Sequence, residues 1–309
     1  MDPSNDVRSS AFLRLQKRLL ENYKIELRPA SGDTLIVLMS PSPNFILGKY
    51  RFRHSVVCMA DSRLTYYTHN AMRQCRHMIN FAREGGFRTV LFLGSSKGGL
   101  GALLWASIAF RREKGIRIKC LSFSPQTQIY PMNEHMIHLP SYQRMISRLD
   151  TESLYAAGIR KYGNVAERVT ASRLAATVVY SSGNAMDAAE AFRLASAPNI
   201  FLYPVDLKFH GSMLAFTSKI GDEFRLRKLV NKLYANAKTD LDLARSLPES
   251  REELADILRK VSGLSLNKMI EIELKGRSKS LRSHFSNLAH LGRMTIKRLR
   301  DRISLVAVK

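Results

Sequence analysis

The segment Arg88–Gly99 constrains the fold of this chain more than any other part of its 309 residues. It begins as an apolar run of strand type, continues into Gly-Ser-Ser-Lys-Gly at residues 94–98, and passes directly into the apolar helical run Leu100–Phe110. A Gly-x-Ser-x-Gly turn between a strand and a helix is typical of a nucleophile elbow, which holds a serine in a strained conformation at the top of a sheet. We therefore identify Ser96 as the candidate nucleophile.

The alternative interpretation of this segment is a structural glycine-rich turn. Gly-x-Ser-x-Gly by itself occurs by chance in roughly one chain in ten of this length. The flanking strand and helix patterns favour the elbow. The segment is not a Walker loop, because Lys97 precedes the last glycines instead of following them.

Apolar strand-like runs alternate with helix-like segments from Thr34 to about residue 206, a pattern typical of βαβ units and a mostly parallel sheet. The expected strands are Tyr23–Leu27, Thr34–Met39, Ser55–Ala60, Thr89–Leu93, Ile116–Phe123, Ala176–Tyr180 and Asn199–Tyr203. The expected helices are His69–Glu84, Lys97–Glu113, Asp187–Ala195 and a longer helical stretch over Ser141–Ala175. That last stretch is too long for a simple crossover between two strands.

A serine nucleophile needs a histidine as general base, and that histidine needs a carboxylate to hold its tautomer. His210 follows the last expected strand in a loop that would bring it over the sheet, so it is the predicted base. Asp187 follows the expected strand Ala176–Tyr180, so it lies at the carboxyl end of the sheet, where active sites of open α/β sheets lie. Glu190, Asp206 or no acid at all are the alternatives, and Asp187 also suits the N-cap of its own helix.

His135 and His138 have a spacing that could suggest a pair of metal ligands. Glu134 is the only carboxylate adjacent to them in the sequence, and no cluster of Cys, His or Asp accompanies them there. We interpret this segment as a loop with two ordinary histidines. The sequence predicts no metal and no cofactor.

The order Ser96, Asp187, His210 and the alternating strand plan resemble the α/β-hydrolase fold over roughly residues 20–238. The resemblance implies an eight-stranded or reduced sheet, a Ser-His-Asp triad and a variable cap inserted after the strand that follows the elbow helix. In this chain the cap would be about residues 127–175.

The resemblance also implies an oxyanion hole formed by the backbone N–H of Lys97 and by an N–H in the loop after an early strand. Ser40 and Ser42 are the candidates in that loop, which lacks the His-Gly-Gly pattern of lipases. Pro41 and Pro43 have no N–H to offer. The ammonium group of Lys97, beside the nucleophile, either attracts an anionic substrate or simply faces solvent.

The formal net charge of +23 at pH 7 implies attraction to polyanions such as nucleic acid, anionic lipid surfaces or acidic glycans. The basic residues are spread along the whole chain, which favours a solvated basic surface over a dedicated groove.

Beyond about residue 240 the sequence is helix-forming, as in Ser250–Lys260, and has no further strand pattern. We therefore expect an α/β-hydrolase domain over residues 1–240 and a helical basic extension over residues 241–309. Lys275–Lys309 contains ten Lys or Arg and one acid, with apolar residues at helical spacing, which is typical of a basic amphipathic helix. This helix would pack on the hydrolase domain, contact an anionic membrane surface or bind a partner. Nucleic acid is a disfavoured partner, because Phe285 is the single aromatic residue of the segment and could stack on few bases.

The three cysteines, Cys58, Cys75 and Cys120, are odd in number and lack metal-type pairing, so we expect reduced thiols.

No signal-peptide pattern opens the sequence, and its longest apolar stretch is too short to span a bilayer. These features predict a cytoplasmic protein, with peripheral association with the membrane as the second choice.

Together these features predict a serine hydrolase that cleaves an ester or other acyl bond, with an acylated glycan or an anionic small molecule as the candidate substrate. An acyltransferase would use the same residues if the acceptor were a sugar hydroxyl or an amine. The alternative from another class is a non-catalytic protein of the hydrolase fold that binds a polyanion or an anionic membrane surface.

Overall fold

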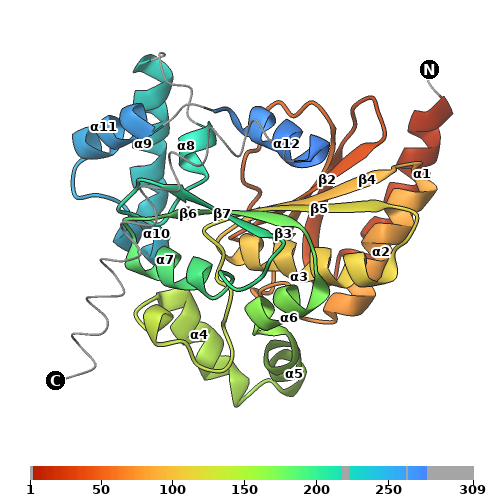
Figure 1. Cartoon of the computed structure of the whole chain (residues 1–309), viewed down its shortest axis with the longest axis horizontal. Coiled ribbons are helices and arrows are strands. Elements are labelled where there is room, and N and C mark those ends of the chain that lie inside the picture. Colours follow the sequence, from red (N-terminus) through yellow and green to blue (C-terminus); the bar gives the residue numbers. More distant parts are fainter. Residues whose placement is uncertain (1–2, 218–222, 262–263, 277–309) are drawn as a thin grey trace.

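A seven-stranded sheet with the order β1-β3-β2-β4-β5-β6-β7 organises the computed structural model, which describes residues 3–217, 223–261 and 264–276 (Figure 1). Strand β1 is antiparallel to β3, and all other neighbouring strands are parallel. All seven expected strands are present, and their ends differ from the expected ones by at most two residues. The strands are β1 Tyr23–Arg28, β2 Thr34–Ser40, β3 Ser55–Asp61, β4 Thr89–Ser95, β5 Arg117–Phe123, β6 Ala176–Ser181 and β7 Ile200–Val205.

The central strands are buried on both faces of the sheet. Along β2, Leu35 and Met39 point into one hydrophobic core while Ile36 and Leu38 point into the other, because successive strand residues face opposite sides. This explains why Leu35–Met39 of β2 is a continuous apolar run instead of alternating with polar residues.

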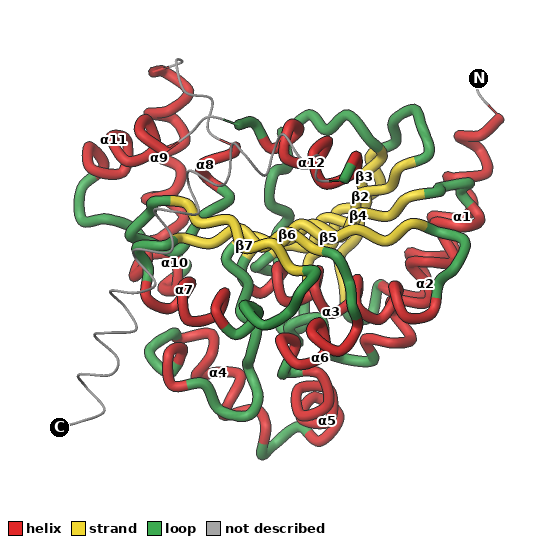
Figure 2. The backbone as a smooth tube through the Cα atoms, viewed as in Figure 1, coloured by secondary structure: helices red, strands yellow, loops and turns green. Residues whose placement is uncertain are grey.

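The helices form a layer on each side of the sheet (Figure 2). The first layer contains α1 Pro3–Leu19, α2 Ala71–Glu84, α3 Lys97–Arg112 and α6 Val165–Ser172. Trp105 of α3 is fully buried in the core beneath this layer. Helix α1 was not predicted from the sequence, because its buried side is only a narrow stripe formed by Ala11, Leu15 and Leu19.

The second layer contains α8 Leu214–Thr217, α9 Glu223–Ala237, α11 Arg251–Val261 and α12 Leu266–Lys275, with α10 Leu241–Ser246 beside it. Leu254, Leu258 and Ile270 are buried against the second face of the sheet. The described part of the expected extension therefore covers one face of the sheet, and the division at residue 240 stays a prediction. The expected basic helix over residues 275–309 lies, apart from its first two residues, outside the described part of the chain.

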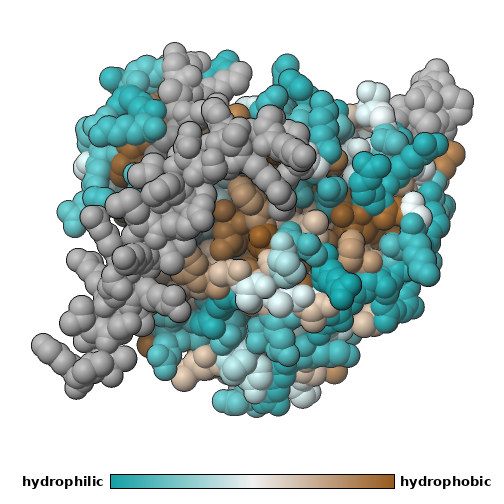
Figure 3. Space-filling view, in the orientation of Figure 1, coloured by the Kyte–Doolittle hydropathy of each residue, from teal (hydrophilic) through white to brown (hydrophobic). Residues whose placement is uncertain are grey.

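The expected cap, residues 127–175, lies between β5 and β6. Its helical stretch is divided into the short turn η1 Glu134–Met136 and the helices α4 Pro140–Leu149, α5 Ser153–Tyr162 and α6. Helices α4 and α5 lie beyond the first helix layer, farthest from the sheet (Figure 1). The surface over these three helices is mostly hydrophilic on the face seen in Figure 3, whereas a hydrophobic band crosses the middle of that face.

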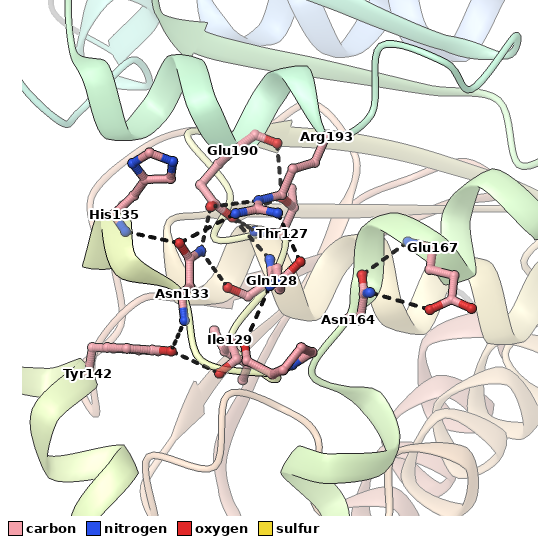
Figure 4. Close-up of polar contacts among 11 residues, drawn as sticks. Thr127, Gln128, Ile129, Asn133, His135, Tyr142, Asn164, Glu167, Glu190 and Arg193 are labelled. Carbon is pink, nitrogen blue, oxygen red and sulfur yellow. Dashed lines mark hydrogen bonds and ion pairs between the residues drawn. The ribbon is translucent and has the colours of Figure 1, made fainter. Parts of the chain in front are cut away.

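A buried carboxylate attaches the start of this insertion to helix α7 Ala185–Phe192 (Figure 4). Oε2 of Glu190 accepts the backbone N–H of Thr127 at 2.6 Å and of Gln128 at 3.0 Å, together with the Thr127 hydroxyl at 2.8 Å. Oε1 of Glu190 accepts Nδ2 of Asn133 at 2.6 Å and Nε of Arg193 at 3.3 Å. Both oxygens are thus occupied by protein donors.

The three cysteines are free and buried, as the sequence predicts. Burial raises the pKa of the Cys58 thiol to about 11, which keeps that thiol protonated at neutral pH.

In the described ranges, no helix combines the length and the apolar character needed to cross a membrane.

We expect Glu190→Gln to lower the free energy of unfolding by about 3 kcal/mol, because an amide cannot accept all of these donors and leaves at least one of them buried and unpaired. Urea denaturation measures this change. Glu167→Gln, an exposed glutamate on α6, is the matched control and should change stability by less than about 0.5 kcal/mol. Equal losses in the two variants would contradict the structural role of Glu190.

Candidate active site

Ser96 lies in a tight turn between β4 and α3. Its backbone has φ 53° and ψ −120°, a conformation that residues with a side chain rarely adopt. The N–H of Ser96 donates to the carbonyl of Phe123 at 2.9 Å, which ties the turn to the end of β5. The strand, strained serine and helix therefore follow one another as in a nucleophile elbow.

The two glycines of the motif are required by close packing. A methyl group at Gly94 would lie 2.1 Å from the carbonyl oxygen of Gly98, and one at Gly98 would lie 2.1 Å from the carbonyl oxygen of Met39. Both distances are far inside van der Waals contact, so only glycine fits at either position. The turn consequently rests directly on the end of β2.

Asp187 and His210, from the segments after β6 and β7, form a hydrogen-bonded pair. Oδ1 of Asp187 lies 2.6 Å from Nδ1 of His210, and the carboxylate is buried. The N-cap of α7 is Asn184, whose side chain accepts the N–H of Asp187 at 3.0 Å. Asp187 as the N-cap of its helix was therefore a wrong expectation, and its carboxylate is available to the histidine.

The second oxygen of Asp187 is held by groups that the sequence did not single out. The hydroxyl of Ser124 donates to Oδ2 of Asp187, and the backbone N–H of Ser181 donates to the same oxygen at 3.3 Å. The hydroxyl of Ser212 lies 2.8 Å from that of Ser124 and donates to the carbonyl of Val179 at 3.1 Å. The sequence signal for Ser124 is its place directly after β5, at the carboxyl end of the sheet.

The environment of His210 favours its charged form. Burial lowers the pKa of the imidazole, but the charge of Asp187 and its hydrogen bond raise it more, so the net pKa lies above its ordinary value. The Lys97 ammonium lowers this pKa and the Asp242 carboxylate raises it, by smaller amounts. A histidine that is to accept a proton from a serine needs this stabilisation of the imidazolium.

Because Nδ1 of His210 is bonded to Asp187, Nε2 is the ring nitrogen available to a nucleophile. Within the described part of the chain, no hydrogen bond joins His210 to Ser96. The Lys97 ammonium group acts on His210 by lowering the pKa of the imidazole. Catalytic contacts of this kind are often long without substrate and shorten when substrate binds.

Lys97, the residue after the candidate nucleophile, has its ammonium group 3.3 Å from Oδ2 of Asp242 on α10, and both side chains are largely buried. Oδ1 of Asp242 accepts the backbone N–H of Ser141 at 3.2 Å, and the Lys97 ammonium lies 6.0 Å from the centre of the Tyr66 ring. Burial raises the pKa of Asp242, but the Lys97 charge and the Ser141 hydrogen bonds outweigh it and lower the pKa. Lys97 therefore neither faces solvent nor carries an unneutralised charge.

The candidate oxyanion donors lie on two sides of the turn. Lys97 is the first residue of α3, so its N–H has no acceptor inside the helix and lies at the positive end of the helix dipole. The hydroxyl of Ser40 accepts the N–H of Ile46 at 3.1 Å, and the hydroxyl of Ser42 bonds within its own turn to Asn44. These two hydroxyls hold the loop, and the role of their backbone N–H groups stays a prediction.

The other candidate groups do not join the site. Both oxygens of Glu190 are occupied by protein donors, Asp206 is exposed, and His54 pairs with Glu271 at 3.0 Å. In the part of the chain that the structure describes, no three His, Cys, Asp or Glu residues are grouped so that they could hold a metal ion.

The mostly parallel sheet, the elbow between β4 and α3, the acid after β6 and the histidine after β7 occur in the order that defines one fold. This chain has the α/β-hydrolase fold. The expected fold class is confirmed, with a sheet reduced to seven strands.

No family model and no curated protein matches this chain. Similar solved structures include a monoacylglycerol lipase from Paleococcus ferrophilus, with 13% identity, TM-score 0.43, and coverage of 68% of this chain and 97% of that one. A carboxylesterase from Nitrososphaera gargenis has 12% identity, TM-score 0.41 and coverage of 59% and 85%. The capsule O-acetyltransferase of Neisseria meningitidis serogroup A has 14% identity, TM-score 0.42 and coverage of 60% and 82%. Similarity this remote does not extend to activity or substrate.

We expect Asp187→Asn to lower the pKa of His210 from above its ordinary value to below it, because burial and the Lys97 charge then act without an opposing carboxylate at Nδ1. NMR titration of the imidazole resonances measures the change. His77 on α2 is the internal control, since burial and nearby arginines lower its pKa and Asp187 has no part in that shift. An unchanged pKa of His210 would contradict the proposed coupling.

Proposed function

We propose that this protein is a serine hydrolase that cleaves an ester or other acyl bond through a Ser96-His210-Asp187 triad. The observation that carries the proposal is the 2.6 Å Asp187–His210 pair on the segments that follow β6 and β7, with Ser96 strained in the elbow after β4. A structural glycine-rich turn needs neither a buried Asp-His pair nor a serine in this conformation.

In the proposed reaction, Nε2 of His210 accepts the proton of the Ser96 hydroxyl as Oγ attacks the acyl carbonyl. Asp187 stabilises the resulting imidazolium, and the N–H of Lys97 with a second N–H in the loop at residues 40–42 stabilises the oxyanion. His210 then protonates the leaving alcohol, which departs and leaves Ser96 acylated. Water, deprotonated by His210, attacks the acyl-enzyme and releases the acid and free Ser96.

The neutralisation of Lys97 bears on the substrate. Because Asp242 lies 3.3 Å from the ammonium group, the environment beside Ser96 has little net positive charge for an anionic acyl group. Of the two expected substrates, this favours an uncharged acyl group, as on an acylated glycan, over an anionic small molecule. Transfer of the acyl group to a sugar hydroxyl instead of water would use the same residues, and analysis of the products distinguishes the two reactions.

We expect a fluorophosphonate probe to label the wild-type protein and neither Ser96→Ala nor His210→Ala, because only an activated serine reacts rapidly. The labelling rate should rise with pH through a midpoint above 6.5, since His210 accepts a proton only when neutral and its pKa is raised. In-gel fluorescence measures labelling. Ser147→Ala and His135→Ala, which change exposed residues of the insertion, are matched controls that should label like wild type. A folded wild type that does not label would favour a non-catalytic protein of the same fold.

We expect Asp242→Asn to favour anionic acyl groups, because it leaves the Lys97 charge without its partner. The ratio of kcat/KM for p-nitrophenyl hydrogen succinate to that for p-nitrophenyl acetate should rise by about tenfold, the effect of one charge-assisted contact. Both substrates are measured on the same protein sample, so a change in the folded fraction cancels from the ratio. An unchanged ratio would show that the Lys97 ammonium does not influence the acyl group.

A further inference from the structure

A concave site lies far from Ser96. Residues from the end of α3, the loop at residues 130–131, the end of α5 and helix α6 line a cavity of about 450 Å³, a size typical of small-molecule sites. Helix α3 begins at the elbow with Lys97, and at 1.5 Å per residue Arg111 lies about 20 Å farther along it. The cavity therefore lies toward the opposite edge of the sheet from the triad and does not depend on the proposed reaction.

The lining of this cavity is strongly basic. Arg111, Arg160, Lys161 and Arg168 line it, and among the described residues Glu167 is its one acidic residue. Asn164 is the N-cap of α6, and its Nδ2 donates to Oε2 of Glu167 at 3.3 Å. No ion pair within 4.0 Å neutralises any of the four basic side chains in the described part of the chain. The cavity thus concentrates unpaired positive charge.

Arg168 supplies the observation that points to a bound ligand. Its Nε is buried and has no hydrogen-bond partner, while its guanidinium group lies 4.9 Å from the centre of the Tyr162 ring and donates through Nη2 to the carbonyl of Lys161 at 3.4 Å. A buried guanidinium N–H without an acceptor is costly, and a ligand oxygen would satisfy it.

We propose that this cavity binds the phosphoryl group of a phosphorylated organic molecule. Guanidinium groups form paired hydrogen bonds with phosphate oxygens, and three arginines with one lysine supply more than enough positive charge to neutralise a phosphate monoester. Tyr130 and Pro131 line the same cavity and supply apolar surface for the organic part. The concave shape of the cavity favours a compact ligand over a membrane surface or an extended polyanion.

Isothermal titration calorimetry with glucose 1-phosphate as the probe tests the proposal on the full-length protein. We expect saturable one-to-one binding that Arg160→Gln/Lys161→Gln weakens by at least about tenfold, the effect of losing charge-assisted contacts. Arg168→Lys, which keeps the charge but removes the fork of donors, should also weaken binding. The matched control is Arg73→Gln/Arg76→Gln, which removes two exposed charges from α2 and should leave binding unchanged.

Three results would overturn the proposal. Equal weakening in the cavity variant and the α2 variant would assign the binding to the overall positive charge. Binding of heparin or of phosphatidylcholine–phosphatidylserine vesicles without binding of glucose 1-phosphate would assign it to an extended polyanion or a membrane surface. Binding of inorganic phosphate as tightly as glucose 1-phosphate would overturn the assignment of an organic ligand. Ser96→Ala should bind glucose 1-phosphate like wild type, because the cavity is remote from the triad.

Discussion

The contact between the turn at residues 94–98 and the end of β2 is the constraint on which the candidate site depends. The backbone of Gly98 lies so close to the carbonyl of Met39 that no side chain fits between them. This packing holds Ser96 in a conformation that a serine would not otherwise keep, because the surrounding sheet and helix α3 offset the strain. The same contact brings the loop after β2 beside the start of α3, where an oxyanion hole would form.

Helix α7 joins the candidate site to the rest of the fold. Asp187 and Glu190 are three residues apart on this helix and both are buried, but they have different partners. Asp187 orients His210, and Glu190 holds the start of the insertion between β5 and β6. A displacement of α7 would therefore disturb the Asp-His pair and the attachment of the insertion together.

The basic residues of this chain are paired with carboxylates at one place and unpaired at another. Beside the candidate nucleophile, Asp242 neutralises Lys97 within a largely buried pair. In the cavity lined by α3, α5 and α6, basic side chains lack carboxylate partners among the described residues. Because an unpaired charge in a concave site attracts anions more strongly than the same charge in a buried pair, the remote cavity is the better candidate for anion recognition.

The sequence alone determined the seven strands and the turn at Ser96, and it made Asp187 and His210 candidates, because hydrophobic periodicity, glycine spacing and position after a strand are local properties of the chain. Tertiary structure decided which polar groups complete the site. Ser124 and Asp187 are 63 residues apart, and Lys97 and Asp242 are 145 apart, so no local pattern relates them. Only the packing of α7 against β6, and of α10 against α4 and α9, brings them into contact, and that packing depends on the shapes of whole faces of the fold.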